Sequence, residues 1–262
     1  MTSLRELMTH LEDHAPLHLQ ESYDNSGLLY GSPDWQVTGV LCCLDATEAI
    51  IEEAKERNCN VVVSHHPIVF KGIRQLNLSH YVDKALVYAI KHDIALYAIH
   101  TNLDNVLKNG VSQQIANRLQ LTNVRLLDPK PGDWGTGTGI LGEMKTPMAI
   151  HEFLPWLKMQ MNTSCIRHTQ PNSRLIQKLA ITGGSGAPWI RKAIQEGADA
   201  YITGDIKYHE FFEANDEIMI CDVGHYESEQ FTIELIARLI SEKFSNFAAH
   251  CTKLNTNPVQ YF

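Results

Sequence analysis

The chain has 262 residues, of which 44% are hydrophobic and 20% are charged, so it is long enough for one large domain or two smaller lobes with apolar cores. Its formal net charge of −8 comes from 30 acidic and 22 basic residues without a Lys or Arg run, which argues against a nucleic-acid partner. No apolar run approaches the roughly 18 residues of a membrane span, and the acidic residues near the N-terminus do not suit a signal peptide, so we expect a cytoplasmic protein with no membrane partner.

Six cysteines occur without a CxxC pair and mostly in apolar surroundings. This pattern favours reduced thiols that pack in the core over a disulfide framework. The adjacent Cys42 and Cys43 lie within an apolar run, where neighbouring side chains of a strand point to opposite faces. We therefore interpret them as packing residues and not as a redox pair.

The first half of the chain alternates predicted helices with short apolar strands. Ser3 and Glu6 form a capping box that predicts an N-terminal helix, and Asp45 and Glu48 predict the start of a second helix in the same way. Strands without strict polar and apolar alternation, separated by helices, are typical of a parallel sheet buried on both faces. The predicted strands are 37–44, 59–66 and 94–100, and the later helices are 45–58, 79–93 and 110–120.

The middle of the chain is less regular. Residues 128–139 are rich in Gly and Pro and predict a boundary or a long loop. Thr146 followed by Pro147 predicts the start of a helix, which Pro155 would bend or split. Alternation then resumes. The predicted strands are 178–184, 199–205 and 217–225, and the predicted helices are 187–198, 207–216 and 227–243.

The two halves of the chain resemble each other in pattern. In residues 55–66 and again in 194–205, a helix ends in a short polar turn and an apolar strand then stops at polar groups. In residues 94–104 and again in 218–229, a strand ends in a histidine that a carboxylate follows four positions later. We interpret this as an internal duplication, which would give two lobes that face each other.

Histidines gather where the predicted strands end. The four that do so are His65, His66, His100 and His225. Ligands of an open parallel sheet bind outside the carboxyl ends of its strands. Asp104 follows His100, and Glu229 follows His225, at a spacing of four residues. Imidazole nitrogens and carboxylate oxygens suit Zn, Mn, Fe and Ni, so the sequence predicts a metal site, and a bridging carboxylate would allow two cations.

The residues around these positions resemble a known family. The motifs are YDNSGLLYG (23–31), SHHPIVFKG (64–72), AIHTNLDN (98–105), TGDIKYHE (203–210) and GHYESEQF (224–231). In this order they resemble the dinuclear-metal family of GTP cyclohydrolase I type 2 homologs, which is related to the yeast NGG-one-interacting factor three. The resemblance extends from residue 23 to the NPVQYF tail, and SHHP combined with GHYxxE is its most specific part.

The resemblance implies a set of metal ligands and a role for one further histidine. The implied ligands are His65, His66, Asp104, His225 and Glu229. Glu229 would bridge two divalent ions, whose identity as Zn, Fe, Mn or Ni the residues do not distinguish. His100 would transfer a proton or support the ligands from the second layer; a histidine that is only hydrogen-bonded at its strand end remains the alternative.

The expected fold is α/β, with two similar, interlocked three-layer lobes that have largely parallel sheets and a metal site in the cleft between them. Residues 1–125 would form the first lobe, to which 225–262 would return, and 126–224 the second lobe. The resemblance also implies a homo-oligomer, a hexamer in relatives. Some relatives carry an inserted domain, for which the middle of this chain is too short.

The implied activity is that of a metal-dependent hydrolase. The resemblance implies attack of activated water on GTP, which yields formate and dihydroneopterin triphosphate. The ligands alone support hydrolysis in general, because a shared metal site does not fix a substrate. Two alternatives therefore stay open: a dinuclear phosphohydrolase of nucleotides or other phosphate esters, and a non-catalytic metal-binding protein with a regulatory or interaction function.

Several polar residues near these motifs have two interpretations. Asp205 and His209 either cap a helix, which we favour, or line the cleft. Asp45 is expected to cap its helix, although its strand end could face the metals. Asp24 is interpreted as a turn residue before a glycine. The segment 181–186, ITGGSG, resembles a phosphate-binding turn but lacks a complete fingerprint.

Overall fold

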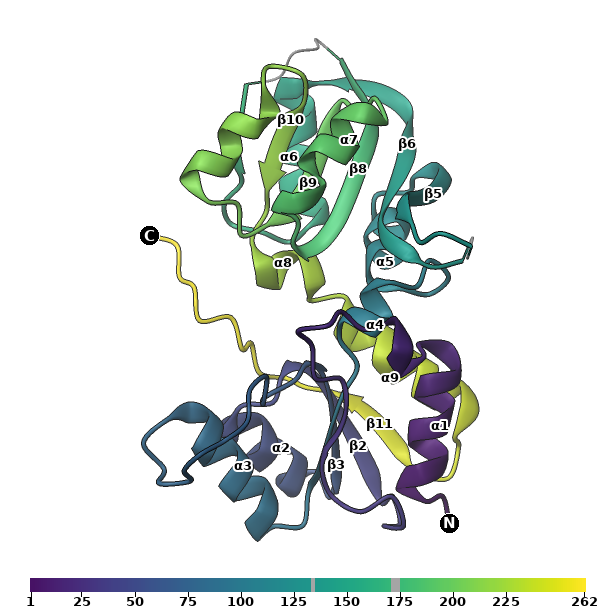
Figure 1. Ribbon diagram of the computed structural model, residues 1–262, viewed down its shortest axis with the longest axis vertical. Helices are drawn as coiled ribbons and strands as arrows, with labels where there is room; N and C mark the ends of the chain where they lie inside the picture. Colours follow the sequence, from purple (N-terminus) through teal and green to yellow (C-terminus); the bar gives the residue numbers. More distant parts are fainter. Residues whose placement is uncertain (133–134, 171–174) are drawn as a thin grey trace. The chain divides into compact units, whose positions relative to one another are not determined.

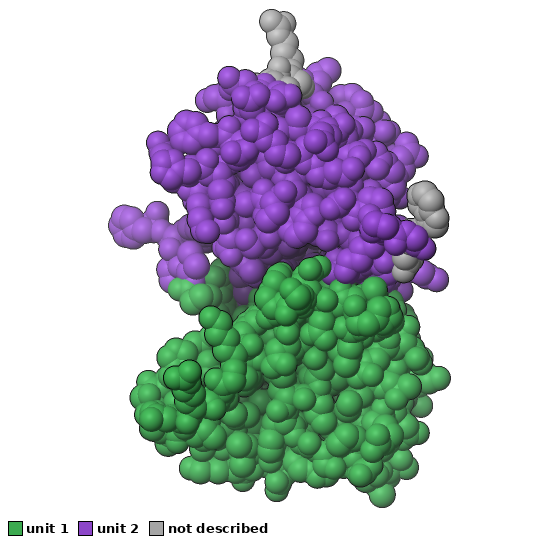
Figure 2. Space-filling view, in the orientation of Figure 1, with its two compact units in different colours: residues 1–103, 232–258 green, residues 104–231, 259–262 purple. Residues whose placement is uncertain are grey.

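The structure is a computed structural model that describes residues 1–132, 135–170 and 175–262. The chain forms two compact units, coloured separately in Figure 2. The first unit comprises Met1–Leu103 and Thr232–Pro258, and the second comprises Asp104–Phe231 and Val259–Phe262. The boundaries expected from the sequence lie near residues 125 and 225.

The first unit is built on a five-stranded sheet in the order β1-β4-β3-β2-β11. Four neighbouring strands run parallel, and only β1 is antiparallel, where it pairs with β4. The strands are β1 (Gly27–Tyr30), β2 (Gly39–Asp45), β3 (Val61–His66), β4 (Ala95–Ala98) and β11 (Ala248–Cys251). Nearly every residue of β2 and β3 is buried, as expected for a sheet covered on both faces.

Helices cover both faces of this sheet (Figure 1). On one face α2 and α3 pack against each other, and on the other α9 packs on β2 and β11 and is in turn covered by α1. The capping box of Ser3 and Glu6 starts α1, as predicted. The helices of this unit are α1 (Leu4–His14), η1 (Leu17–Leu19), α2 (Glu48–Glu56), α3 (Tyr81–Lys91), α4 (Thr101–Asp104, whose last residue begins the second unit) and α9 (Thr232–Lys243).

The second unit contains a six-stranded sheet in the order β5-β6-β8-β9-β10-β7. Its centre, β8-β9-β10, is parallel, whereas the pairs β5-β6, β6-β8 and β10-β7 are antiparallel. The strands are β5 (Thr122–Pro129), β6 (Gly137–Ala149), β7 (Arg167–His168), β8 (Leu175–Ser185), β9 (Ala200–Gly204) and β10 (Met219–Asp222).

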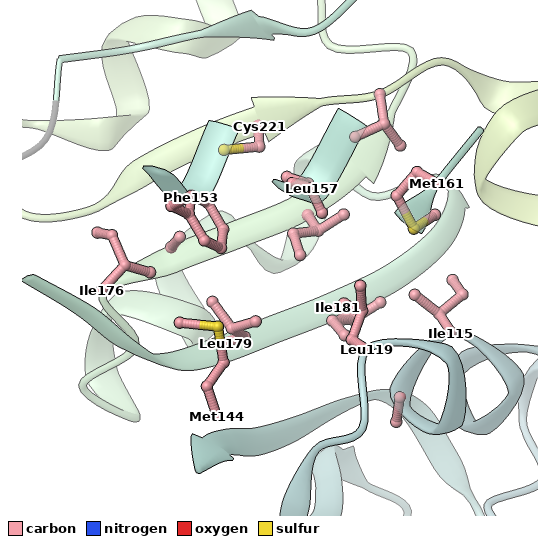
Figure 3. Close-up of a cluster of buried hydrophobic side chains, with 14 of the residues drawn as sticks. Ile115, Leu119, Met144, Phe153, Leu157, Met161, Ile176, Leu179, Ile181 and Cys221 are labelled. Carbon is pink, nitrogen blue, oxygen red and sulfur yellow. The ribbon is translucent and has the colours of Figure 1, made fainter. Parts of the chain in front are cut away.

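One of the buried apolar clusters of the second unit lies between α6 and the sheet (Figure 3). Phe153 and Leu157 of α6 are fully buried and pack in one cluster with Leu179 and Ile181 of β8. Pro155 lies between them on the exposed side of the helix. The helices of this unit are α5 (Val111–Arg118), α6 (Ile150–Gln160), η2 (Ala187–Trp189), α7 (Ile190–Gln195), η3 (Tyr208–Ala214) and α8 (His225–Glu229).

The two sheets share a topology. In the first, β2, β3 and β4 are successive parallel neighbours, and the preceding strand β1 pairs antiparallel with β4. In the second, β8, β9 and β10 are successive parallel neighbours, and the preceding strand β7 pairs antiparallel with β10. The repeated pattern in the sequence therefore corresponds to a repeated order of strands.

The α/β fold class is confirmed, but several local predictions are wrong. The residue before α2 is Thr47, so Asp45 does not cap this helix. Residues 146–147 belong to β6, because the antiparallel pairing of β6 with β8 extends to Ala149 and α6 begins only at Ile150. The predicted final helix is two helices, α8 and α9, that are separated at residues 230–231.

The Gly- and Pro-rich segment 128–139 joins two long antiparallel strands that the sequence analysis did not predict. β5 ends at Pro129 and β6 begins at Gly137. Residues 133–134 of this segment lie outside the described residues. Among the helices that the structure describes, none is long and apolar enough to span a lipid bilayer.

Candidate metal centre

Three histidines come together in the first unit. β3 ends with His65 and His66, and His100 follows the neighbouring strand β4, so parallel pairing brings all three to one edge of the sheet. Each offers a ring nitrogen within 4.8 Å of those of the other two. Their ring centroids are 5.0 to 5.3 Å apart. His65 is fully buried, whereas His66 and His100 are partly exposed.

An oxygen atom holds Nδ1 of each of these rings. His65 Nδ1 donates to the backbone carbonyl of Ile99 over 2.9 Å, and His66 Nδ1 donates to Asp45 Oδ1 over 2.9 Å. The hydroxyl of Thr256 in turn donates to Asp45 Oδ2 over 2.6 Å. Because these acceptors carry no proton, the neutral imidazoles bear their hydrogen on Nδ1 and their lone pair on Nε2. This arrangement is typical of metal-binding histidines.

His100 is held in the same way by a carboxylate that lies completely inside the unit. Its Nδ1 donates to Asp24 Oδ1 over 2.8 Å. Asp24 also accepts from the Thr101 amide over 3.1 Å, from the Thr101 hydroxyl and from the Ser26 hydroxyl over 2.9 Å. Burial acts to raise the pKa of Asp24, but the hydrogen bonds and charge of His100 and the Thr101 hydroxyl outweigh it and lower the pKa below its usual value. Asp24 is therefore a partner of His100 and not only a turn residue.

The second unit joins His225 with two carboxylates. His225 begins α8 and Glu229 ends it, one helical turn later, which places His225 Nε2 3.0 Å from Glu229 Oε2. His225 Nδ1 donates to Asp205 Oδ2 over 2.7 Å. Asp205 does not cap η3, since the residue before η3 is Lys207. The interpretation in which Asp205 lines the site is therefore the better one.

The carboxylates of Glu229 and Asp205 outweigh burial in setting the pKa of His225. Burial lowers its pKa, but the carboxylates of Glu229 and Asp205 together raise the pKa of His225 to about 11. The ring is therefore protonated at neutral pH when only protein groups surround it. A cation that binds Nε2 must displace this proton, and so metal uptake would release protons.

Two glycines at the end of β8 leave room for Glu229. A Cβ at Gly183 would lie 3.5 Å from Glu229 Cγ. A Cβ at Gly184 would overlap the Glu229 carboxylate and lie 3.3 Å from His225 Cε1, and Gly184 has a φ of +62°. The ITGGSG segment that resembles a phosphate-binding turn thus packs against Glu229. This close approach requires the residue without a side chain.

Of the remaining predicted residues, Asp104 offers a carboxylate oxygen within 4.8 Å of one of Glu229 in the second unit. Asp104 is the last residue of α4, one turn after His100, and it is partly exposed. His209 is exposed on η3, where its ring contacts Tyr208 and Phe212 with centroid distances of 5.1 and 6.4 Å. The first unit thus contains three histidines that could bind a metal, and the second contains one, His225, with the buried carboxylate of Glu229 beside it.

The profile of the family Duf34/NIF3 (NGG1p interacting factor 3) matches residues 2–258. The chain belongs to the DUF34/NIF3 family. All the histidines and carboxylates described above lie within the matched range.

Curated members of the family carry a common name. A protein of Clostridium perfringens called GTP cyclohydrolase 1 type 2 homolog is 31% identical over 244 residues, with 93% of each chain covered. A protein of the same name from Staphylococcus epidermidis is 26% identical, with 98% of this chain and 99% of the relative covered. That alignment runs over 365 positions, so the staphylococcal relative contains segments that this DUF34/NIF3 chain lacks.

Solved structures show the same fold. The crystal structure of Staphylococcus aureus protein SA1388 matches with a TM-score of 0.92 and 31% identity, covering 100% of this chain and 99% of that one. A Bacillus cereus protein related to NIF3 matches with a TM-score of 0.93 and 23% identity over 100% and 99% of the two chains. The α/β fold with two sheets is therefore that of the family.

Proposed function

We propose that this DUF34/NIF3 protein is a metal-dependent hydrolase with a dinuclear centre held by His65, His66, Asp104, His225 and Glu229. The observation that carries the proposal is the orientation of the histidines: an oxygen acceptor holds Nδ1 of each ligand imidazole and thereby assigns Nε2 to the metal. The buried carboxylate of Glu229 would help to hold both ions.

When bound, two divalent cations supply the Lewis acidity that makes water a nucleophile near neutral pH. The protein contributes positioning and proton transfer. His100 accepts and returns a proton at Nε2, while Asp24 fixes the ring through Nδ1 and stabilises the imidazolium. The donor set suits Zn, Fe, Mn or Ni.

The substrate proposed from the name of the relatives is GTP, with formate and dihydroneopterin triphosphate as products. A phosphohydrolase would release phosphate from nucleotides instead. A regulatory or interaction protein, as the name NGG1p interacting factor suggests for a relative, would bind metal without turnover. Assays for formate, pterin fluorescence and free phosphate on one nucleotide panel distinguish these three functions. We also propose that the protein is cytoplasmic and that it forms a homohexamer. Light scattering would test the hexamer.

The first experiment is elemental analysis of protein purified without a His tag. We expect about two metal ions per chain, as in a dinuclear site, and a sharp loss in Glu229→Ala and in His66→Ala. His209→Ala is the matched control, because this histidine is exposed and contacts only neighbouring aromatic rings in its described contacts. A wild type that neither contains metal nor takes up Zn, Mn or Fe would refute the hydrolase proposal.

A further inference from the structure

A buried carboxylate outside the proposed ligand set joins the two segments that carry Asp205 and His225. Asp222 is the last residue of β10 and is only 3% exposed. Its Oδ2 accepts from the backbone amide of Ile206 over 3.0 Å, and its Oδ1 accepts from that of Gly224 over 3.0 Å. These amides belong to the residue after Asp205 and the residue before His225.

Both segments have conformations that ordinary residues avoid. Asp205 has a φ of +57°, and Gly224 has a φ of +97°. A Cβ at Gly204 would lie 2.8 Å from the amide nitrogen of His225, so the two backbones are in unusually close contact. Such conformations persist only where the surroundings hold them. The carboxylate of Asp222 provides that restraint from one side chain.

Arg167 completes the arrangement. It lies opposite Asp222 in the β7-β10 ladder, and its guanidinium donates to Asp222 Oδ2 and, over 2.8 Å, to the carbonyl of Ile206. The guanidinium also lies over the ring of Phe211 at 5.3 Å. The residue that follows Asp205 is therefore held at both its N–H and its C=O.

We propose that Asp222, supported by Arg167, is the positioning residue that sets the hydrogen bond between Asp205 and His225 and thereby the direction of His225 Nε2. In its described hydrogen bonds, Asp222 contacts neither the His225 ring nor any of the five proposed metal ligands. It therefore acts through the backbone. That the direction of His225 Nε2 matters for metal binding rests on the function proposed above. The hydrogen bond itself can be measured without metal.

The test compares wild type with Asp222→Asn, which keeps the size of the side chain but removes its charge. In metal-free protein, NMR of the histidine ring should show a slowly exchanging Nδ1 proton of His225, assigned with His225→Gln, and this signal should be lost in Asp222→Asn. The affinity for Zn²⁺, measured against a competing chelator, should fall about 10- to 100-fold. Both measurements are made well below the unfolding temperature. A change in thermal stability alone would therefore not remove the NMR signal or lower the Zn²⁺ affinity.

Glu196→Gln is the matched control, because it also removes one carboxylate from an arginine, Arg125, within the same unit. It should leave the His225 signal and the Zn²⁺ affinity unchanged. Retention of both in Asp222→Asn would overturn the proposal. If Asp222→Asn does not fold, Arg167→Met takes its place, with loss of the signal supporting and retention overturning the inference. If even the wild type binds no Zn²⁺, the proposed function fails, and the NMR signal alone decides the role of Asp222.

Discussion

At the scale of single residues, the histidines could be predicted but their partners could not. His65, His66 and His225 follow apolar strands, and this position is visible in the sequence. The oxygen atoms that hold their Nδ1 atoms come from elsewhere. Three carboxylates, Asp45, Asp24 and Asp205, hold His66, His100 and His225 and lie 21, 76 and 20 residues from them in the sequence. His65 is held by the Ile99 carbonyl instead. Asp45 and His66 are partners in the β2-β3 ladder, whereas Asp24 and Asp205 lie outside the strands, and spacing in the sequence encodes none of these contacts.

Asp24→Asn should reduce turnover strongly while the metal content stays near that of the wild type. The amide cannot stabilise a protonated His100 or fix its tautomer, and such a loss typically costs about 10²- to 10⁴-fold in kcat. Steady-state kinetics and elemental analysis of the same preparation measure both quantities. Asp34→Asn is the control, since this exposed carboxylate pairs only with Arg5 among its described contacts. Equal turnover in Asp24→Asn and wild type would exclude His100 from proton transfer.

Gly184→Ala should lower both stability and metal content. Its Cβ would overlap the carboxylate of Glu229, and its φ of +62° is unfavourable for alanine, so we expect a loss of about 1–3 kcal/mol in the free energy of unfolding. Gly72→Ala is the control, because a Cβ there meets no atom within 4 Å. Denaturant unfolding and elemental analysis measure the two effects. Two variants of equal stability and metal content would show that Glu229 adjusts freely.

At the scale of secondary structure elements, most parallel strands were predicted, whereas the parallel strand β11 and the antiparallel strands β1, β5, β6 and β7 were not. Residues 61–66 and 200–204 are short, apolar and flanked by helices, which is typical of buried parallel strands. β6 instead contains three glycines, a lysine and a proline within 13 residues, and its ladder with β8 is irregular between Glu143 and Met148. Its composition therefore indicated a loop and a helix start, and tertiary pairing overrode that tendency.

An ion-pair cluster between β5 and α7 should make stability depend on pH. Glu196 accepts from Arg125 over 2.6 Å and pairs with Lys192 over 2.9 Å, and these hydrogen bonds lower the pKa of Glu196 to about 2. A lowered pKa stabilises the folded state at pH values above the ordinary pKa of 4.5, and this contribution is lost as the pH falls towards 2.

The difference in unfolding free energy between wild type and Glu196→Gln should therefore be largest above pH 4.5 and vanish near pH 2. Its size should be about 1 kcal/mol or less, because these groups are near the surface. Urea unfolding of both proteins from pH 2 to pH 6 measures it. A difference that does not depend on pH would mean that the ion pairs contribute nothing.

The buried face of α6 should dominate the stability of the second unit. Phe153 is fully buried in the cluster of Figure 3, so Phe153→Ala should cost about 3–5 kcal/mol. Met159 on the same helix is 65% exposed, and Met159→Ala should change stability by about 0.5 kcal/mol or less. Hydrogen exchange of the amides of β8 and β9 reports the difference within this unit. Similar effects of both substitutions would mean that α6 is not packed as described.

At the scale of the whole molecule, the sequence predicted two α/β halves, and the structure divides into two compact units with related strand orders. The sequence did not show where the chain passes between them, because the passages at 103–104 and 231–232 interrupt helical segments; a third, at 258–259, follows the last strand. α4 connects His100 to Asp104 at the first passage, and the break between α8 and α9 follows Glu229 at the second. Periodicity alone continues through both points.

Because the chain passes between the units more than once, the gene cannot be divided into one part for each unit. A gene split after residue 103 would leave the first unit without α9 and β11, and Ile236, Leu239 and Ile240 of α9 are buried in it. A single cut in the chain cannot give two complete units, because each unit is built from two separate stretches of the sequence. A gene for this fold can therefore be exchanged whole or gain insertions. A single fragment of it does not encode either complete unit with its histidines and carboxylates.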